Sequence, residues 1–159
     1  MTTPVGDAQV VLAKFTGALL SYMILWVPLL GCVLIVRHYS NDPSAFDTGA
    51  IAATYLGIFL VGAMALSLGI LASAITRSQI IAAAITLAAG LTLFVMSFLS
   101  AVASKSDLFG QLAAHVALIE HMRDFAHGMI DTRPLVFYTT LTTFFLFLSW
   151  KVVESRRWK

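Results

Sequence analysis

Charged side chains are scarce in this 159-residue sequence: Asp, Glu, Lys and Arg make up only 11% of the chain, while 59% of the residues are hydrophobic. Soluble domains usually carry about 25% charged residues. This scarcity and a mean hydropathy of +0.89 exclude an ordinary soluble domain and indicate an integral membrane protein. The formal net charge of +2 comes from dispersed basic residues, which excludes a nucleic-acid-binding surface.

Several motifs are missing as well. The single cysteine, Cys32, excludes an internal disulfide. No Gly-rich loop ends in Gly-Lys-Ser/Thr and no nucleophile motif is present, so we expect neither an enzyme nor a bound cofactor. The first basic residue is Lys14, which Asp7 offsets, and this start does not fit a secretory signal. The interiors of the predicted spans hold no unpaired Asp, Glu, Lys, Arg or His, which disfavours ion-coupled transport.

What is present is a set of long apolar runs. A membrane-crossing helix needs about 20 apolar residues. Two runs are free of charge and are separated only by Thr76-Arg77-Ser78-Gln79, which predicts a membrane hairpin. The predicted fold class is an all-α membrane protein with a single transmembrane domain and four transmembrane helices, at about 15–36, 48–75, 80–103 and 135–153.

Small residues recur at helical spacing on both arms of the hairpin. Small residues let two helix backbones approach closely where lipid provides no hydrophobic drive. Alanine is abundant here, so the pattern also has a chance explanation, but we favour direct packing of the two helices. The predicted packing residues are Ala65, Gly69 and Ser73 on the first arm and Ala82, Thr86 and Gly90 on the second.

A more polar tract between the third and fourth spans predicts an amphipathic surface helix at about 107–127. Its expected apolar stripe, with Ile119 among the buried residues, consists of Leu108, Leu112, Val116, Ile119, Met122 and Ala126. We expect Gly128 to end this helix and Asp131 to begin the next one, while Asp47 is expected to cap the second span.

Glu120, Asp124 and His127 lie at i, i+4 and i+7 and therefore share one helical face. This arrangement is compatible with a metal ion, but the same spacing describes the solvated face of a surface helix. Because no second cluster completes the coordination, we favour the solvated face and predict no metal site.

Four spans place both termini on one side of the membrane. That side carries six basic residues, Lys14, Arg77, Lys151, Arg156, Arg157 and Lys159, and the other side carries four, Arg37, Lys105, Arg123 and Arg133. Basic residues prefer the cytoplasmic side. We therefore predict a multi-pass protein of the cell inner membrane with both termini in the cytoplasm.

Four short motifs together resemble a known family. They are Thr3-Pro4-Val5 with Lys14-Phe15, Tyr55-Leu56-Gly57 through Ala74-Ile75-Thr76-Arg77-Ser78-Gln79, Phe125-Ala126-His127-Gly128-Met129-Ile130-Asp131, and Glu154-Ser155-Arg156-Arg157-Trp158. In their order and spacing the chain resembles permease subunits of ABC-2 type ATP-driven exporters. Within that family it is most similar to the branch of the gliding-motility permease and the copper-maturation permease of nitrous oxide reductase clusters.

This resemblance implies a permease whose partners are a cytoplasmic ABC ATPase, a second permease chain in a homodimer or heterodimer, and membrane lipid. Family members look like six-span proteins, and the four spans here match the last four. On that alignment the residual ATPase-coupling segment is Thr3, Pro4, Val5 and Lys14, and we expect the isolated chain to insert without retaining an ATPase.

Other functional classes stay open at this point. They are a non-transporting structural or assembly membrane protein, a non-functional truncated permease, and a membrane-surface metalloenzyme that uses Glu120, Asp124 and His127. Copurification of an ATPase would favour the permease, and stable assembly without one would favour the structural class. Stoichiometric bound metal would favour the metalloenzyme.

Overall fold

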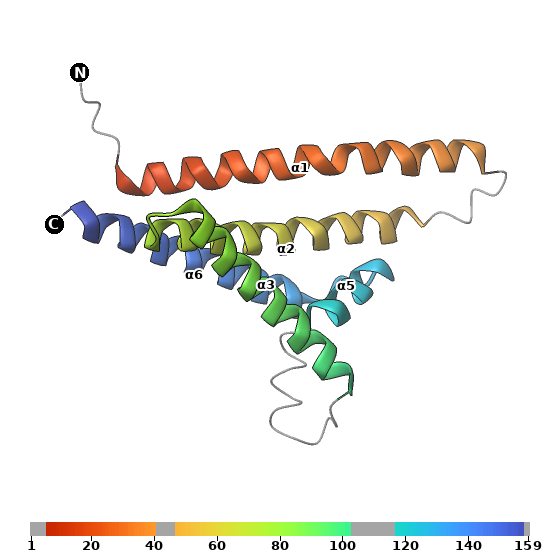
Figure 1. The fold of residues 1–159 in the computed structure, drawn as a ribbon. Coiled ribbons are helices and arrows are strands. Elements are labelled where there is room, and N and C mark those ends of the chain that lie inside the picture. The colour runs from red at the N-terminus through yellow and green to blue at the C-terminus, as the bar shows by residue number, and fades with distance from the viewer. Residues whose placement is uncertain (1–5, 41–46, 103–116, 158–159) are drawn as a thin grey trace.

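The computed structural model is all-helical and describes residues 6–40, 47–102 and 117–157 (Figure 1). The described helices are α1 (Asp7–Tyr39), α2 (Thr48–Ile75), α3 (Gln79–Val102), α5 (Leu118–Ala126) and α6 (Thr132–Arg157). Four of them, α1, α2, α3 and α6, are long and apolar enough to cross a membrane. The predicted fold class, four spans with a short helix between the third and fourth, is therefore confirmed, and the chain is a multi-pass membrane protein.

Helix α1 extends beyond the predicted span at both ends. It has 33 residues, which corresponds to about 50 Å, whereas the hydrocarbon layer is about 30 Å thick. The backbone N–H of Gly6 donates to Oε1 of Gln9 at 3.2 Å, and Asp7 lies in the first turn. This local capping begins the helix ahead of the apolar run. The helix is continuous through Pro28.

The hairpin of α2 and α3 has defined ends. Oδ1 of Asp47 accepts a hydrogen bond from the backbone N–H of Gly49 at 2.8 Å, so the predicted cap of the second span is confirmed. At the other end the backbone N–H and the hydroxyl of Thr76 both donate to the Ala72 carbonyl, at 3.1 and 2.8 Å. Only three residues then separate α2 from Gln79, where α3 begins.

Helix α2 lies at the centre of the bundle and contacts each of the other described helices. Figure 1 shows the start of α1 and the end of α6 at one end of the bundle, with the turn between α2 and α3 at that same end. From this turn α3 diverges obliquely from α2, whereas α1 runs beside α2. The buried core consists mainly of α2 side chains with one residue each from α5 and α6: Ala53, Leu60, Met64, Phe125 and Tyr138.

Two glycines of α2 make room for aromatic rings from neighbouring helices. A Cβ atom at Gly57 would lie 2.8 Å from Cδ2 of Phe125, and one at Gly62 would overlap the ring of Tyr22. Because the two glycines are five residues apart, they face different directions around the helix. The missing side chains therefore let α5 and α1 pack closely on two faces of α2.

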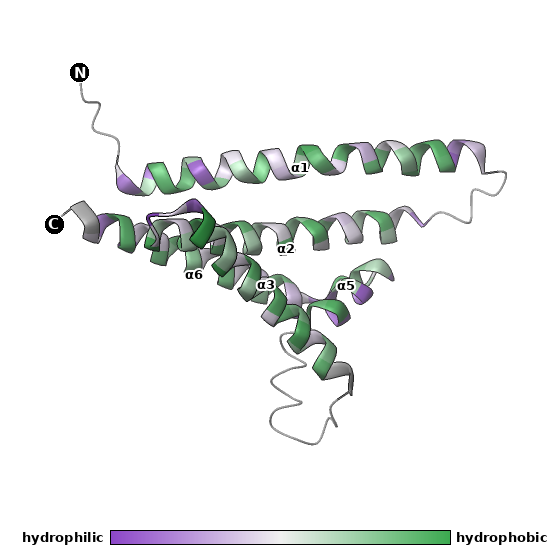
Figure 2. Cartoon of the chain, in the orientation of Figure 1, coloured by the Kyte–Doolittle hydropathy of each residue, from purple (hydrophilic) through white to green (hydrophobic). Residues whose placement is uncertain are grey.

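The outer faces of the bundle are apolar. Figure 2 shows hydrophobic residues along the middle of the helices and the most hydrophilic ones toward their ends and in the turn after α2. In the most apolar 18-residue stretch of α1, which the structure describes throughout, no residue is buried by protein. Such side chains need lipid as their solvent.

Helix α5 corrects the predicted amphipathic stripe. Phe125 is 1% exposed, whereas Ile119 is 43% exposed, so the prediction that Ile119 is buried is wrong. Ala126, the last residue of the apolar repeat, is also exposed. The helix is rotated because the space above Gly57 admits the Phe125 ring, and Met122 packs beside it. Residues Leu108, Leu112 and Val116 lie outside the described ranges.

Candidate functional site

A polar pocket of about 280 Å³ lies between α5 and the start of α6. Figure 1 shows these two segments, α5 and the start of α6, well away from the end of the bundle at which α6 ends. The lining of the pocket combines acidic, basic and aromatic side chains: Glu120, His121, Asp124, Asp131, Arg133, Pro134 and Phe137.

The backbone behind this pocket is shaped by the end of α5. The N–H of Gly128 donates to the Phe125 carbonyl and the N–H of Met129 to the Asp124 carbonyl, both at 3.0 Å. These two bonds form a Schellman motif, which requires the positive φ of 75° that Gly128 adopts. The predicted glycine cap is confirmed. A Cβ atom at Gly128 would lie 3.4 Å from the backbone of Ala50, so the turn also packs against the start of α2.

The other wall of the pocket begins with the cap of α6. Oδ1 of Asp131 accepts a hydrogen bond from the backbone N–H of Arg133 at 3.3 Å, which confirms the predicted start of this helix. Pro134, in the first turn of the helix, is buried. Proline is tolerated there because the first N–H groups have no intrahelical acceptor.

A polar contact between side chains joins the two walls. Nδ1 of His121 lies 3.2 Å from the hydroxyl of Tyr138, within hydrogen-bond distance. Tyr138 is fully buried, and its ring packs edge-on against both His121 and Phe137. A buried tyrosine hydroxyl needs a polar partner, so this contact fixes α5 relative to α6.

Helix α3 holds the start of α5. The backbone N–H of Leu118 donates to Oγ of Ser97 at 2.7 Å, and that hydroxyl donates to the Leu93 carbonyl at 2.9 Å. Ser97 is 2% exposed. The serine therefore satisfies a helix-start N–H of α5 from a distant part of the chain, a role that normally falls to a local cap.

The pocket is lined by charged side chains of both signs. It holds three carboxylates, Glu120, Asp124 and Asp131, against one guanidinium, Arg133. Within the described parts of the chain no three His, Cys, Asp or Glu side chains converge as a metal-binding group. His127 does not line the pocket, so the alternative trio of Glu120, Asp124 and His127 is not brought together around it.

The predicted packing stripes of α2 and α3 meet in part. A Cβ atom at Gly69 would lie 3.7 Å from Cγ2 of Thr86, which is ordinary contact distance. Ala82 is buried, but Gly90, Ala65 and Ser73 are exposed. Four of the six predicted residues line one open apolar groove of about 740 Å³: Gly69, Ala82, Thr86 and Gly90.

The predicted ATPase-coupling residues fall mostly outside the described ranges. This applies to Thr3, Pro4 and Val5. Lys14 is described: it lies on α1, is exposed, and belongs to the half of α1 nearer the termini. Its end of the bundle is also the end at which Arg77 lies in the turn between α2 and α3.

Several residues that organise the site were not predicted. They are Gly57, Gly62, Ser97, Tyr22 and Tyr138. The glycines carry a sequence signal, because Gly57, Gly62 and Gly69 lie at steps of five and seven along one run, whereas the predicted packing residues lie at steps of four. Ser97 and the two tyrosines carry no such signal, because their partners are distant in the sequence.

Comparison with known proteins adds no relative to this description. No protein-family model, no curated protein and no solved structure matches the chain.

Proposed function

We propose that the chain is the membrane-spanning permease subunit of an ATP-driven exporter of the ABC-2 type, with ATP hydrolysed by a separate subunit. The observation that carries this proposal is the segment Phe125–Asp131, one of the motifs on which the resemblance depends. It forms a compact unit in which Phe125 packs on Gly57, Gly128 turns the chain and Asp131 starts α6. Phe125, Gly128 and Asp131 of the motif thus have defined structural roles just ahead of the last span.

The proposed orientation places both termini in the cytoplasm and the α5–α6 pocket outside the inner membrane. It is supported by the six-to-four distribution of basic residues. It is further supported by the position of Arg77 and the termini at one end of the bundle, because a cytoplasmic ATPase would then approach the more basic end.

The proposed membrane partner is a second permease chain. The open groove along α2 and α3 supports this part of the proposal, because it exposes Gly90 beside large apolar residues such as Leu87, Leu91 and Phe94. Close approach of a further transmembrane helix is favoured where small residues interrupt an apolar surface.

The proposal is tested by photo-crosslinking in the membranes of the native host, where contacts too weak to survive purification are still captured. A photoreactive amino acid is placed at Lys14 or Arg77, at the proposed cytoplasmic end, and at Tyr39, at the other end. We expect an ATP-hydrolysing subunit to be crosslinked from Lys14 and Arg77.

Tyr39 is the matched control, since it is 79% exposed at the opposite end of α1 and should crosslink no ATPase. An ATPase captured from Tyr39 but not from Lys14 would overturn the orientation. A stable membrane complex that contains no ATPase at any of these positions would instead favour the structural or assembly class.

A further inference from the structure

An apolar groove lies between the start of α1 and the second half of α6. It has a volume of about 370 Å³ and is lined by Ala8, Val11, Leu12, Thr143, Leu146, Phe147 and Trp150. Thr143 adds little polarity, because its hydroxyl donates to the Thr139 carbonyl of its own helix at 2.8 Å. The walls therefore favour a hydrocarbon ligand.

This groove continues toward the middle of α6. A second hollow of about 490 Å³ shares Thr143 and Phe147 with the first and extends to Thr139. From Thr139 to Trp150 the helix rises about 16 Å, which is close to half of the roughly 30 Å hydrocarbon thickness. The combined groove thus spans one leaflet, the depth that the acyl chain of a phospholipid occupies.

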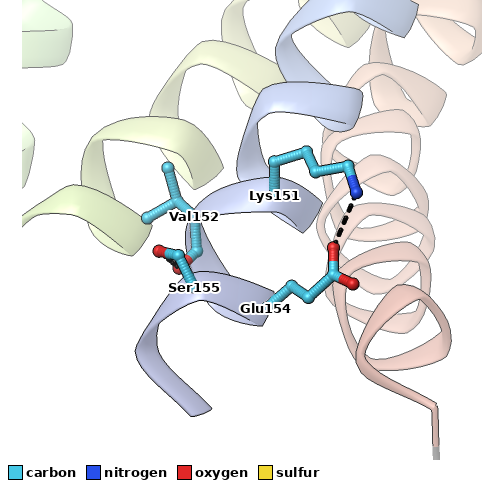
Figure 3. Close-up of polar contacts among 4 residues, drawn as sticks. All are labelled: Lys151, Val152, Glu154 and Ser155. Carbon is cyan, nitrogen blue, oxygen red and sulfur yellow. Dashed lines mark hydrogen bonds and ion pairs between the residues drawn. The ribbon is translucent and has the colours of Figure 1, made fainter. Parts of the chain in front are cut away.

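A basic side chain, Lys151, lies just beyond Trp150, the groove residue nearest the end of α6. Nζ of Lys151 lies 4.8 Å from the ring centroid of Trp150, which lines the groove, and 2.8 Å from Oε2 of Glu154. Figure 3 shows Lys151 and Glu154 on the side of α6 nearest the α1 ribbon, and α1 and α6 are in contact. Both side chains remain partly exposed, at 50% and 39%.

At this end Lys151 offers donors to an anion beside two acidic residues, its partner Glu154 and Asp7 in the first turn of α1. An ammonium group has three donors, so Lys151 can keep its bond to Glu154 and still donate to a phosphate oxygen. The sequence from 151 to 159 adds Arg156, Arg157 and Lys159, and Glu154 is its only acidic residue. Basic clusters directly beside a membrane span attract anionic lipid headgroups.

We propose that the groove between α1 and α6 binds an anionic phospholipid, with an acyl chain along Val11, Leu146 and Phe147 and the phosphate at Lys151. A second copy of the chain fits the groove less well, because a parallel neighbour would bring two basic tails together. A neutral lipid would fill the groove but would gain nothing from Lys151. This site does not depend on the proposed transport function.

The test uses Trp150 as the reporter. The full chain with Trp26→Phe and Trp158→Phe retains one tryptophan, in the groove, and is reconstituted into bilayers containing either brominated phosphatidylglycerol or brominated phosphatidylcholine. We expect the anionic lipid to quench Trp150 with an apparent affinity about fivefold higher than the neutral one, as one basic contact provides.

Variants separate headgroup recognition from general charge. Lys151→Gln should abolish the preference, whereas Arg77→Gln, which removes a basic residue at the same end of the bundle but away from the groove, should preserve it. Thr143→Phe should reduce quenching by both lipids because it fills the groove. If Lys151→Gln fails to insert, Glu154→Gln provides the second test, since releasing Lys151 should strengthen the preference.

Equal quenching by the two lipids would overturn the proposal, and so would a preference that Arg77→Gln lowers as much as Lys151→Gln does. A third outcome is that neither lipid quenches Trp150 until the protein is diluted in the bilayer. This outcome would identify a second copy of the chain as the occupant of the groove and would also overturn the proposal.

Discussion

The ring of Tyr22 on α1 lies directly over the backbone of Gly62 on α2. No side chain larger than that of glycine fits beneath the ring in this position. The tyrosine hydroxyl also donates to the Ile58 carbonyl of α2 at 3.2 Å, one turn away. Since most of α1 faces away from protein, this contact is a principal attachment of α1 to the rest of the bundle.

Gly62→Ala should therefore weaken the attachment of α1. A methyl group there forces either the ring or the whole helix to move, and such overpacking typically costs about 1–3 kcal/mol. We expect a lower thermal unfolding midpoint in detergent and faster hydrogen exchange in α1. Gly31→Ala is the matched control, because nothing lies within 4 Å of its Cβ position and alanine favours the helix. Equal midpoints for the two variants would contradict the packing described for Tyr22.

The rotation of α5 predicts which of its apolar residues matters. Phe125→Ala should cost about 3–5 kcal/mol, as is usual for a buried aromatic residue, because its ring fills the space above Gly57. Ile119→Ala should have little effect on the fold, since Ile119 is 43% exposed. The hydrogen-exchange rates of the α5 amides measure the effects of both substitutions. A larger effect from Ile119→Ala would restore the stripe predicted from the sequence.

The contact between His121 and Tyr138 predicts a smaller, localised effect. Tyr138→Phe keeps the buried ring and removes only the hydroxyl, so we expect a loss of roughly 0.6 kcal/mol, the average for such bonds between membrane helices. The exchange of amides in α5 and the first turns of α6 should increase. Tyr39→Phe serves as the control, because Tyr39 is 79% exposed and should leave exchange unchanged. Uniform destabilisation by Tyr138→Phe would mean that the hydroxyl supports the whole bundle rather than this joint.

The proposed orientation has a direct chemical test. In a Cys32→Ala background, single cysteines at Asp42 and Ser106 should react with a membrane-impermeant thiol reagent in intact cells, whereas a cysteine at Lys159 should react only after lysis. The expectation follows from the basic residues, which favour the cytoplasm. Labelling of the Lys159 position in intact cells would reverse the topology.

The sequence predicted the parts of the fold that depend on local chemistry. Long uncharged runs predicted the spans, and the caps at Asp47, Gly128 and Asp131 were predicted correctly because capping is decided within a few residues. The buried face of α5 was not predicted correctly, because apolar residues occur on more than one side of that helix. Its rotation is decided by an opening in α2, more than 60 residues away, which periodicity within α5 does not encode.

The pocket between α5 and α6 likewise combines features that are local in the sequence with contacts between distant residues. Glu120 and Asp124 were recognised as one helical face, and both line the α5–α6 pocket. Their setting depends on contacts across the sequence, namely Ser97 at the start of α5 and Tyr138 beside His121. A serine or tyrosine in an apolar run has no feature that reveals a distant partner, so these contacts required the structure.

The glycine contacts of α2 also bear on how the bundle can rearrange. Phe125, Tyr22 and Thr86, from three different helices, lie against Gly57, Gly62 and Gly69. A ring over a glycine is confined by the side chains before and after it, so a helix that slides along α2 must first lift away. Well-packed contacts of this kind have discrete positions rather than a continuous range. Any motion of this bundle should therefore occur as steps between docked states, with α2 as the common axis.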